Sequence, residues 1–406
     1  MKKVFLIEGK RSPYVKAFSL LNDVNSLDLG VYLVNYLKTQ YNLQKLDDFI
    51  IGSVYQSPHY ANFARNLLLH AGLPDHIPAY TVQRNCASGL EAIRQAYFSI
   101  QENSSFVLAG GVESMSSMPL LIKPALQKFL LTFARSKKIL EKISLLKSIP
   151  FKDLFSYTFA LEEGLKDGFL GCRMGDTAEY LAKTYNITRE EQDLFSLNSH
   201  KKASLADFSS EIVPYGGKTF IHKDIGPREN LTIEQLQKLK PYFDPSFGSV
   251  TTGNSSPITD GAAVCLIASE EFCNKEGLTP IAEILGFETV ALNPRLMGLG
   301  PVQVIENLLQ KFSLTVQDID LFEINEAFAA QTLSVLKILK DKNIEIPLEK
   351  LNTLGGAIAL GHPVGSSGSR LPLSLAYNLK KNKLKYGIAT LCIGGGQGQG
   401  VLLKSV

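Results

Sequence analysis

The chain has 406 residues, of which 45% are apolar and 20% charged, and its formal net charge is +3. This length predicts two or three domains, the composition excludes wholesale disorder, and the low net charge argues against a nucleic-acid partner. Five widely spaced cysteines without a Cys-x-x-Cys pair argue against a disulfide framework or a zinc site, so we expect no bound metal.

The first 120 residues alternate short apolar runs with helical patterns. The run at 4–8 is too short for a secretory signal, and no later run reaches the ~18 apolar residues of a membrane span, so we expect a cytoplasmic protein. Strands are predicted at 4–8, 47–53, 79–83 and 106–111, and helices at 28–41 and 62–71. Such alternation predicts α/β packing around a buried sheet.

Cys86 lies at the start of a further predicted helix, in the run Asn85-Cys86-Ala87-Ser88-Gly89. The unpaired N–H groups and the macrodipole of a helix N-terminus favour a thiolate over a thiol. The small residues that follow leave room for a substrate. We interpret Cys86 as a candidate nucleophile, and the alternative is a buried cysteine that acts as a small hydrophobic residue.

The segment 121–152 is strongly basic and amphipathic. Its single acidic residue is Glu141, and apolar residues recur between the charges at helical spacing. The basic residues are Lys123, Lys128, Arg135, Lys137, Lys138, Lys142, Lys147 and Lys152. One interpretation is a solvated helix face that covers a pocket. The other is a surface for an anionic ligand, a partner protein or a membrane.

The α/β pattern resumes at about residue 250. Strands are predicted at 264–269, 281–287, 321–324, 387–392 and 401–404. The recurrence of similar strand and glycine patterns indicates two similarly built halves, with the irregular region 121–249 inserted into the first.

Three further residues carry chemistry in this second part. Asn325 follows a predicted strand, where α/β proteins place ligand groups, although it could also cap a helix. His362 lies among small residues, and Cys392 precedes the glycines 394–396, whose N–H groups could form an oxyanion hole. A cysteine, a histidine and a second cysteine supply a nucleophile, a base and an acid, which suits carbon–carbon chemistry beside a thioester better than hydrolysis. None of the glycine runs matches a dinucleotide fingerprint.

With these residues assembled, the chain resembles the thiolase family over nearly its whole length. The resemblance rests on motifs that occur in the family's order. They are Asn85-Cys86-Ala87-Ser88-Gly89, Gly110-Gly111-Val112-Glu113-Ser114-Met115-Ser116, Arg173-Met174-Gly175-Asp176-Thr177-Ala178-Glu179, Val250-Thr251-Thr252-Gly253-Asn254-Ser255-Ser256, Asp260-Gly261-Ala262-Ala263, Asn325-Glu326-Ala327-Phe328, Gly361-His362-Pro363 and Cys392-Ile393-Gly394-Gly395-Gly396.

The resemblance implies an α/β thiolase fold, in which two similar halves form a five-layered α-β-α-β-α sandwich. It divides the chain into an N-terminal half at 1–120, completed by 250–274, an inserted loop domain at 121–249 that binds coenzyme A, and a C-terminal half at 275–406. It also implies a homodimer or homotetramer.

The resemblance assigns roles to the candidate residues. Cys86 matches the acyl-carrying nucleophile, His362 the base that activates it, and Cys392 the acid and base for the carbon acid. Asn325 matches the residue that positions a water beside His362 for one oxyanion hole. The backbone N–H groups of Cys86 and Gly394 would form the other oxyanion hole.

Coenzyme A is expected as a substrate, and no cofactor is expected to be bound permanently. Arg228, Ser256 and Met174 fall where the family contacts coenzyme A. Arg173 stands where biosynthetic acetoacetyl-CoA thiolases usually place a histidine, and the surrounding run looks more like thiolase subunits of fatty-acid β-oxidation complexes. In such subunits, a segment like 121–152 contacts a hydratase/dehydrogenase partner or a membrane. Asn325, however, replaces the histidine that those subunits usually carry.

We therefore expect CoA-dependent thiolytic cleavage of 3-ketoacyl-CoA to acetyl-CoA and a shortened acyl-CoA, reversible as a Claisen condensation. The alternative is a short-chain acetyl-CoA C-acetyltransferase that makes acetoacetyl-CoA. A ketoacyl synthase of the same superfold would lack the Cys392 motif, and a non-catalytic thiolase-like lipid-binding protein would not need Cys86, His362 and Cys392 together.

Overall fold

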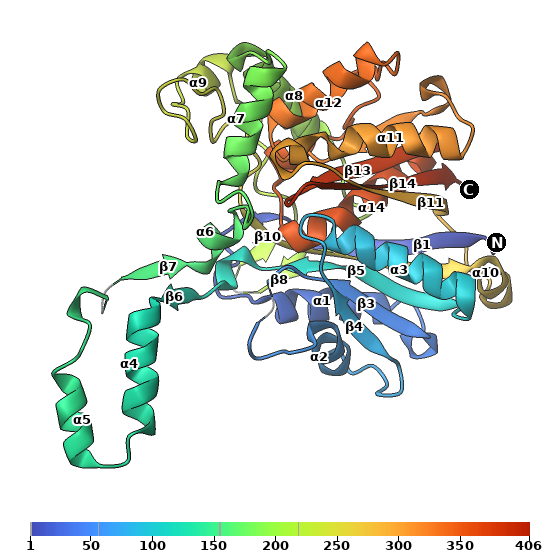
Figure 1. The fold of residues 1–406 in the computed structure, drawn as a ribbon. Coiled ribbons are helices and arrows are strands. Elements are labelled where there is room, and N and C mark those ends of the chain that lie inside the picture. Colours follow the sequence, from blue (N-terminus) through green and yellow to red (C-terminus); the bar gives the residue numbers. More distant parts are fainter. Residues whose placement is uncertain (1, 56, 154–155, 218) are drawn as a thin grey trace.

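The molecule has a body built on one ten-stranded sheet, from which a helical hairpin projects (Figure 1). The computed structural model describes residues 2–55, 57–153, 156–217 and 219–406. The strand order is β12-β13-β14-β11-β1-β10-β5-β3-β4, with β2 paired to β10. The strands of the sheet are β1 (Val4–Arg11), β2 (Val15–Lys16), β3 (Asp48–Gly52), β4 (Ala79–Val82), β5 (Phe106–Glu113), β10 (Thr259–Ser269), β11 (Ala282–Ala291), β12 (Leu321–Ile324), β13 (Tyr386–Ile393) and β14 (Gln397–Ser405). All nine strands predicted from the sequence are present.

The two parts of this sheet repeat one arrangement. In the first part β3 runs parallel to β5, and β5 runs antiparallel to β10. In the second part β12 likewise runs parallel to β13, and β13 runs antiparallel to β14. Leu351 bridges Phe322 in parallel at the place that β4 occupies beside β3. The parts join where Phe5 and Leu6 pair with Glu283 and Ala282. This repetition confirms the prediction of two similarly built halves.

Helices and sheets form five layers. The helices α1 and α2 cover the outer face of the first half, α3 and α14 lie between the halves, and α11 and α12 cover the second half (Figure 1). The strand β5 is buried on both faces, so that Leu108 packs in the outer cluster and Val107 in the central one. The helices are α1 (Ser26–Lys38), α2 (Phe63–His70), α3 (Ser88–Glu102), α10 (Glu270–Glu276), α11 (Gly300–Lys311), α12 (Ala329–Asp341), α13 (Ala357–Leu360) and α14 (Val364–Asn382).

The central helices α3 and α14 touch at their first turns. A Cβ atom at Gly89 would lie 2.8 Å from the backbone nitrogen of Ser369, and one at Gly368 would lie 2.5 Å from the backbone nitrogen of Leu90. Only glycine permits backbones to approach this closely. The segments that lead into α3 and α14 therefore converge on one region of the body.

Between β5 and β10 the chain leaves the main sheet. Its regular elements there are β6 (Leu120–Ile122), α4 (Pro124–Arg135), α5 (Ile139–Leu146), β7 (Tyr157–Phe159), α6 (Ala160–Gly164), α7 (Met174–Thr184), α8 (Arg189–Leu205), β8 (Tyr215–Gly216), β9 (Phe220–Ile221) and α9 (Ile233–Gln237). Short 3-10 helices over the whole chain are Leu43–Lys45, Met115–Ser117, Phe151–Asp153, Pro294–Leu299 and Val316–Asp318. The domain boundaries at 121 and 249 stay predictions.

The helices α4 and α5 stand apart from the body at the end of the β6–β7 pair (Figure 1). The interpretation of 121–152 as a cover over a pocket therefore does not describe this structure. Of the helices that the described residues form, none is long and apolar enough to cross a membrane.

A buried arginine ties the inserted region to β1. Arg11 is fully buried and donates to both carboxylate oxygens of Asp224, at 2.7 and 2.8 Å, and to the carboxylate of Glu211. Asp224 also accepts the backbone N–H of Tyr14 at 2.7 Å. These contacts position the segment that continues to Arg228, because Ile225 next donates its N–H to the Tyr14 carbonyl.

Replacing Asp224 with asparagine is predicted to destabilise the protein by about 3 kcal/mol or more, because it leaves the buried charge of Arg11 only partly balanced. Urea unfolding measures the effect. Asp207→Asn is the control, since Asp207 forms an exposed pair with Lys381 and its loss should change stability little. Equal unfolding midpoints for the two variants would contradict the prediction.

Candidate active site

Cys86 lies directly before the first turn of α3. The helix begins at Ser88 with Ala87 as its N-cap, so the predicted position of Cys86 at a helix N-terminus is confirmed. Asn85 holds a left-handed backbone (φ 43°) and donates its side-chain amide to the Gly394 carbonyl at 2.9 Å. This bond ties the turn before α3 to the loop that follows β13.

Two backbone N–H groups point at the sulfur of Cys86. They belong to Gly394 and to Cys86 itself. Burial raises the pKa of the Cys86 thiol, and these two hydrogen bonds offset only part of that effect. The expectation that the helix terminus favours a thiolate is therefore wrong for the free protein, because desolvation outweighs the two backbone hydrogen bonds. Cys86 needs a base to ionise.

His362 is held as a neutral base. Its Nδ1 lies 2.6 Å from the Ser367 hydroxyl, and that hydroxyl donates to the Pro363 carbonyl at 3.1 Å. Since the hydroxyl proton is already used, Nδ1 carries the imidazole hydrogen and Nε2 keeps its lone pair. Nε2 is buried without a hydrogen-bond partner in the described part of the chain. Burial, with a smaller effect of the Arg370 charge, lowers the pKa of His362 to about 4.

Cys392 lies at the buried end of β13, beside Cys86. It packs with Met297 and Ala327, and Met174 lies against the same cluster. Burial raises the pKa of the Cys392 thiol, and the negative charge of an ionised Cys86 raises it further. Cys392 is therefore protonated at neutral pH and is suited to donate a proton.

Asn325 follows β12 and is completely buried. Its backbone N–H donates to the Thr390 carbonyl at 3.0 Å, whereas neither atom of its side-chain amide has a partner among the described residues. The alternative interpretation as a helix cap is wrong, because α12 begins at Ala329 with Phe328 as its N-cap. A buried amide with both groups unpaired can hold a water or a substrate atom.

Glu326 fixes the loops that carry Asn325 and His362. Its carboxylate accepts from Ser199 at 2.7 Å, from the side chain of Asn352 at 2.8 Å and from the N–H of Ile358 at 3.2 Å. No role for Glu326 or Ser367 was predicted from the sequence. For Ser367, the one sequence feature that could have indicated a contact with His362 is its position five residues later, near the start of a helix.

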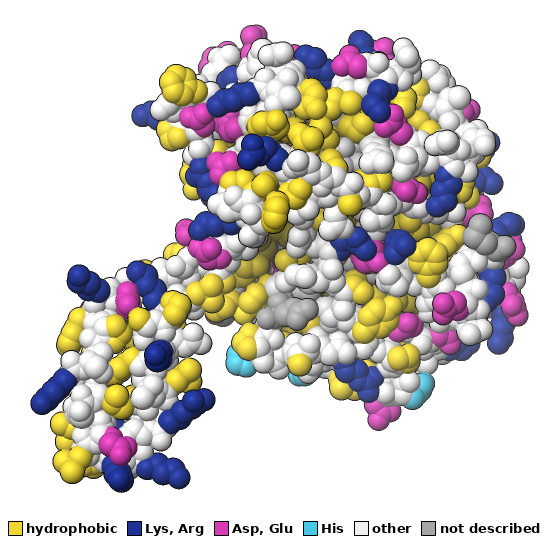
Figure 2. All heavy atoms as spheres, in the orientation of Figure 1, with side chains coloured by type: hydrophobic (Ala, Val, Ile, Leu, Met, Phe, Trp, Pro, Cys, Tyr) yellow, Lys and Arg dark blue, Asp and Glu magenta, His cyan; other side chains and the backbone are white. Residues whose placement is uncertain are grey.

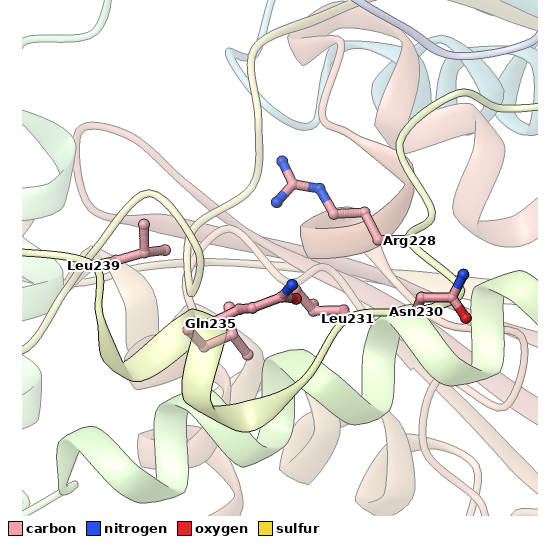
Figure 3. Close-up of a pocket in the computed structure, with 6 residues that line it drawn as sticks. Arg228, Asn230, Leu231, Gln235 and Leu239 are labelled. Atoms are coloured by element: carbon pink, nitrogen blue, oxygen red, sulfur yellow. The ribbon is translucent and has the colours of Figure 1, made fainter.

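A pocket of about 350 Å³ lies in the inserted region (Figure 3). Its lining residues are Arg228, Asn230, Leu231, Gln235, Leu236 and Leu239. Neither Cys86 nor Cys392 lines it. The pocket adjoins the loop that carries Ser256, because Leu236 and Leu239 pack closely on Gly253.

Of the remaining candidate residues, Met174 and Ser256 border the Cys392 cluster, whereas Arg228 lies in the pocket. Met174 lies against Gly394, with its methyl carbon 3.1 Å from the position of a Cβ there. Ser256 donates its N–H to the Ala327 carbonyl at 3.0 Å and so borders the Cys392 cluster. Arg228 lines the pocket, and its backbone N–H donates to Nδ1 of His200 at 3.2 Å. No cluster of potential metal ligands occurs in residues 2–55, 57–153, 156–217 and 219–406.

Comparison with known proteins identifies this arrangement. Residues 4–271 match the model of the thiolase N-terminal domain, and residues 278–405 match that of the thiolase C-terminal domain. The chain belongs to the thiolase family. It is therefore an enzyme, an acyltransferase, and its fold is the thiolase fold.

Curated relatives and solved structures agree with this assignment. A probable acetyl-CoA acyltransferase of Staphylococcus aureus (strain COL) is 39% identical, with 98% of each chain covered. The Bacillus anthracis acetyl-CoA acetyltransferase has a TM-score of 0.89 at 36% identity, with 100% of this thiolase and 99% of that chain covered. Human mitochondrial 3-ketoacyl-CoA thiolase in complex with CoA has a TM-score of 0.88 at 34% identity, with 100% of this chain and 98% of that chain covered.

Replacing Ser367 with alanine is predicted to lower kcat about tenfold or more, because Nδ1 of His362 loses the acceptor that holds the reactive tautomer. KM should change little, and Ser367→Thr should restore activity. Ser374→Ala is the control, since that hydroxyl lies on the same helix and is buried without a partner in the described residues. Steady-state kinetics that show equal kcat for Ser367→Ala and Ser374→Ala would refute the tautomer argument.

Proposed function

We propose that this thiolase cleaves 3-ketoacyl-CoA with free coenzyme A, giving acetyl-CoA and a shortened acyl-CoA through an acyl group on Cys86. The observation that carries the proposal is the pair of adjacent sulfurs, Cys86 and Cys392, with the N–H of Gly394 directed at the first. One sulfur suffices for hydrolysis, whereas cleavage of a carbon–carbon bond needs a second group that protonates the departing carbon.

In the first half-reaction, Nε2 of His362 takes the proton of Cys86, and the thiolate attacks the ketone carbon. The bond between that carbon and the α-carbon breaks, and its electrons leave on the acetyl-CoA enolate. Cys392 gives its proton to the α-carbon. A water held by Asn325 beside His362 stabilises the enolate oxygen, and the N–H groups of Cys86 and Gly394 stabilise the oxygen of the acyl group.

In the second half-reaction, the thiol of coenzyme A gives its proton to the Cys392 thiolate and attacks the acyl carbon. The bond to Cys86 breaks, and His362 returns the proton to the leaving sulfur. The enzyme regains its starting protonation state. The reverse sequence with two acetyl-CoA molecules is a Claisen condensation.

The inserted loop domain is proposed to hold coenzyme A. The pocket at Arg228 offers a cation and three leucines. Met174 packs on the Cys392 cluster, and Ser256 donates its N–H to the Ala327 carbonyl of that cluster. The related human thiolase whose structure contains CoA supports a CoA site in this fold. The homodimer or homotetramer, the cytoplasmic location and the role in β-oxidation remain part of this proposal.

The second candidate function is a short-chain acetyl-CoA C-acetyltransferase that makes acetoacetyl-CoA. The similarity to the Bacillus anthracis acetyl-CoA acetyltransferase favours it. Rates of CoA-dependent cleavage over a series of 3-ketoacyl-CoA chain lengths distinguish the two functions. Activity confined to acetoacetyl-CoA would select the second candidate.

Cys86→Ala is predicted to lower the thiolysis rate by on the order of 10³-fold or more, because no other group can carry the acyl chain. Cys392→Ala should still accept an acyl group on Cys86 but lose carbon–carbon cleavage. Cys273→Ala is the matched control, as Cys273 is a free thiol that packs in the outer hydrophobic cluster of the first half, and it should keep the wild-type rate. Wild-type thiolysis by Cys86→Ala would end the proposed mechanism, and full thiolysis by Cys392→Ala would remove Cys392 from the acid role.

A further inference from the structure

His200 is a buried histidine that the proposed reaction does not use. It lies on α8, is 6% exposed, and accepts the backbone N–H of Arg228 on its Nδ1 at 3.2 Å. Because a backbone N–H can only donate, Nδ1 carries no hydrogen, and the ring hydrogen of neutral His200 is on Nε2. His200 therefore presents a hydrogen-bond acceptor to the loop that carries Arg228.

The charge state of His200 preserves this acceptor. Burial, with a smaller effect of the Arg228 charge, lowers the pKa of His200 to about 4. A protonated ring would carry hydrogens on both nitrogens and could not accept the N–H of Arg228. At neutral pH the ring is uncharged, so the bond between His200 and Arg228 is kept.

Arg228 supplies the cationic group of the pocket. Of the residues that line the pocket, Arg228 alone carries a charge, and its side chain is exposed (Figure 3). The guanidinium forms no ion pair or hydrogen bond within the described part of the chain. The surface around α9, which contributes Gln235 and Leu236 to the pocket, combines hydrophobic and charged side chains (Figure 2). A guanidinium that no carboxylate neutralises suits the phosphates of coenzyme A.

The helix of His200 is itself fixed to the candidate active site. The neighbouring Ser199 donates its hydroxyl hydrogen to Glu326 at 2.7 Å and accepts the N–H of Gly356 at 3.0 Å. Glu326 and Gly356 belong to the loops that carry the candidate catalytic groups. The imidazole of His200 therefore lies on a support that has a defined position relative to those groups.

The loop of Arg228 has few other attachments. Gly226 lies directly on α13, because a Cβ atom there would clash with the Ala359 carbonyl oxygen. Over residues 226–230, the bond to His200 is the described hydrogen bond that joins the loop backbone to another element. This bond therefore sets the position of the Arg228 backbone.

We propose that His200 is a positioning residue for coenzyme A, which holds the backbone of Arg228 so that the guanidinium faces the phosphates of the bound molecule. The proposal rests on the coenzyme A site proposed above at Arg228. His200 acts through Arg228 and touches no reacting atom, so it contributes equally to the binding of coenzyme A and of its esters. Binding energy that substrate and transition state share lowers KM and leaves kcat unchanged.

Three variants of His200 test the role of Nδ1. His200→Ala should raise the Kd and the KM for coenzyme A about tenfold, with kcat changed less than about twofold, since only shared binding energy is lost. His200→Asn keeps an acceptor near the position of Nδ1 and should restore binding to within about threefold of wild type. His200→Gln places its amide near the position of Nε2 and should behave like His200→Ala. Isothermal titration calorimetry measures Kd, and steady-state thiolysis measures KM and kcat.

Pantetheine, which lacks the phosphates of coenzyme A, separates the position of Arg228 from general damage to the site. With pantetheine as the acyl acceptor, His200→Ala and the wild type should have the same kcat/KM. Ser196→Ala is the control for α8, because the Ser196 hydroxyl is buried and bonds within the helix to the Gln192 carbonyl at 2.7 Å. It should bind coenzyme A as the wild type does.

Arg228→Ala distinguishes failure of this proposal from failure of the coenzyme A site. A wild-type Kd for coenzyme A in Arg228→Ala would place the ligand elsewhere and overturn both. Weak binding by Arg228→Ala together with wild-type binding by His200→Ala would overturn the role of His200 alone. Equal losses in His200→Ala and His200→Asn, or an equal loss with pantetheine, would overturn it as well, because a histidine that only fills space predicts those results.

Discussion

The close contact between α3 and α14 is the constraint on which the site depends. The two helices come from different halves, and glycines at their crossing let the first turns meet backbone to backbone. Cys86 precedes α3 and His362 precedes α14, which are the equivalent helices of the repeated fold. The duplicated architecture thus places Cys86 and His362, the proposed nucleophile and base, directly before equivalent helices of the two halves. A side chain at either glycine would separate the two helices.

Burial determines the protonation states of the site. It raises the pKa of the Cys86 and Cys392 thiols and lowers the pKa of His362 to about 4, so all three groups are neutral in the free enzyme. In the proposed reaction, charge develops only when substrate arrives and the proton moves from sulfur to Nε2. The N–H groups of Cys86 and Gly394 would then face negative charge, which such fixed dipoles stabilise.

The local sequence predicted much of this structure. Apolar runs located every predicted strand of the sheet because most of those strands are buried on both faces, and the Cys86 and Cys392 motifs lie at the helix start and strand end where they were expected. The expected thiolate at Cys86 was wrong, since the helix rule is local, whereas the desolvation depends on the tertiary packing around the sulfur. The tautomer of His362 depends on the orientation of the Ser367 hydroxyl, which no spacing rule gives. The position of α4 and α5 away from the body could not be predicted from the sequence either, because an amphipathic pattern does not show whether the apolar face of a helix packs on the body.

Mass spectrometry of peptides from enzyme incubated with acetyl-CoA is the most direct test of the central claim, that Cys86 alone carries the acyl group. The account predicts one acetyl group per chain on the peptide that contains Cys86, and its loss when free coenzyme A is added. An acetyl group on the peptide that contains Cys392, or no CoA-sensitive acetylation at all, would contradict it.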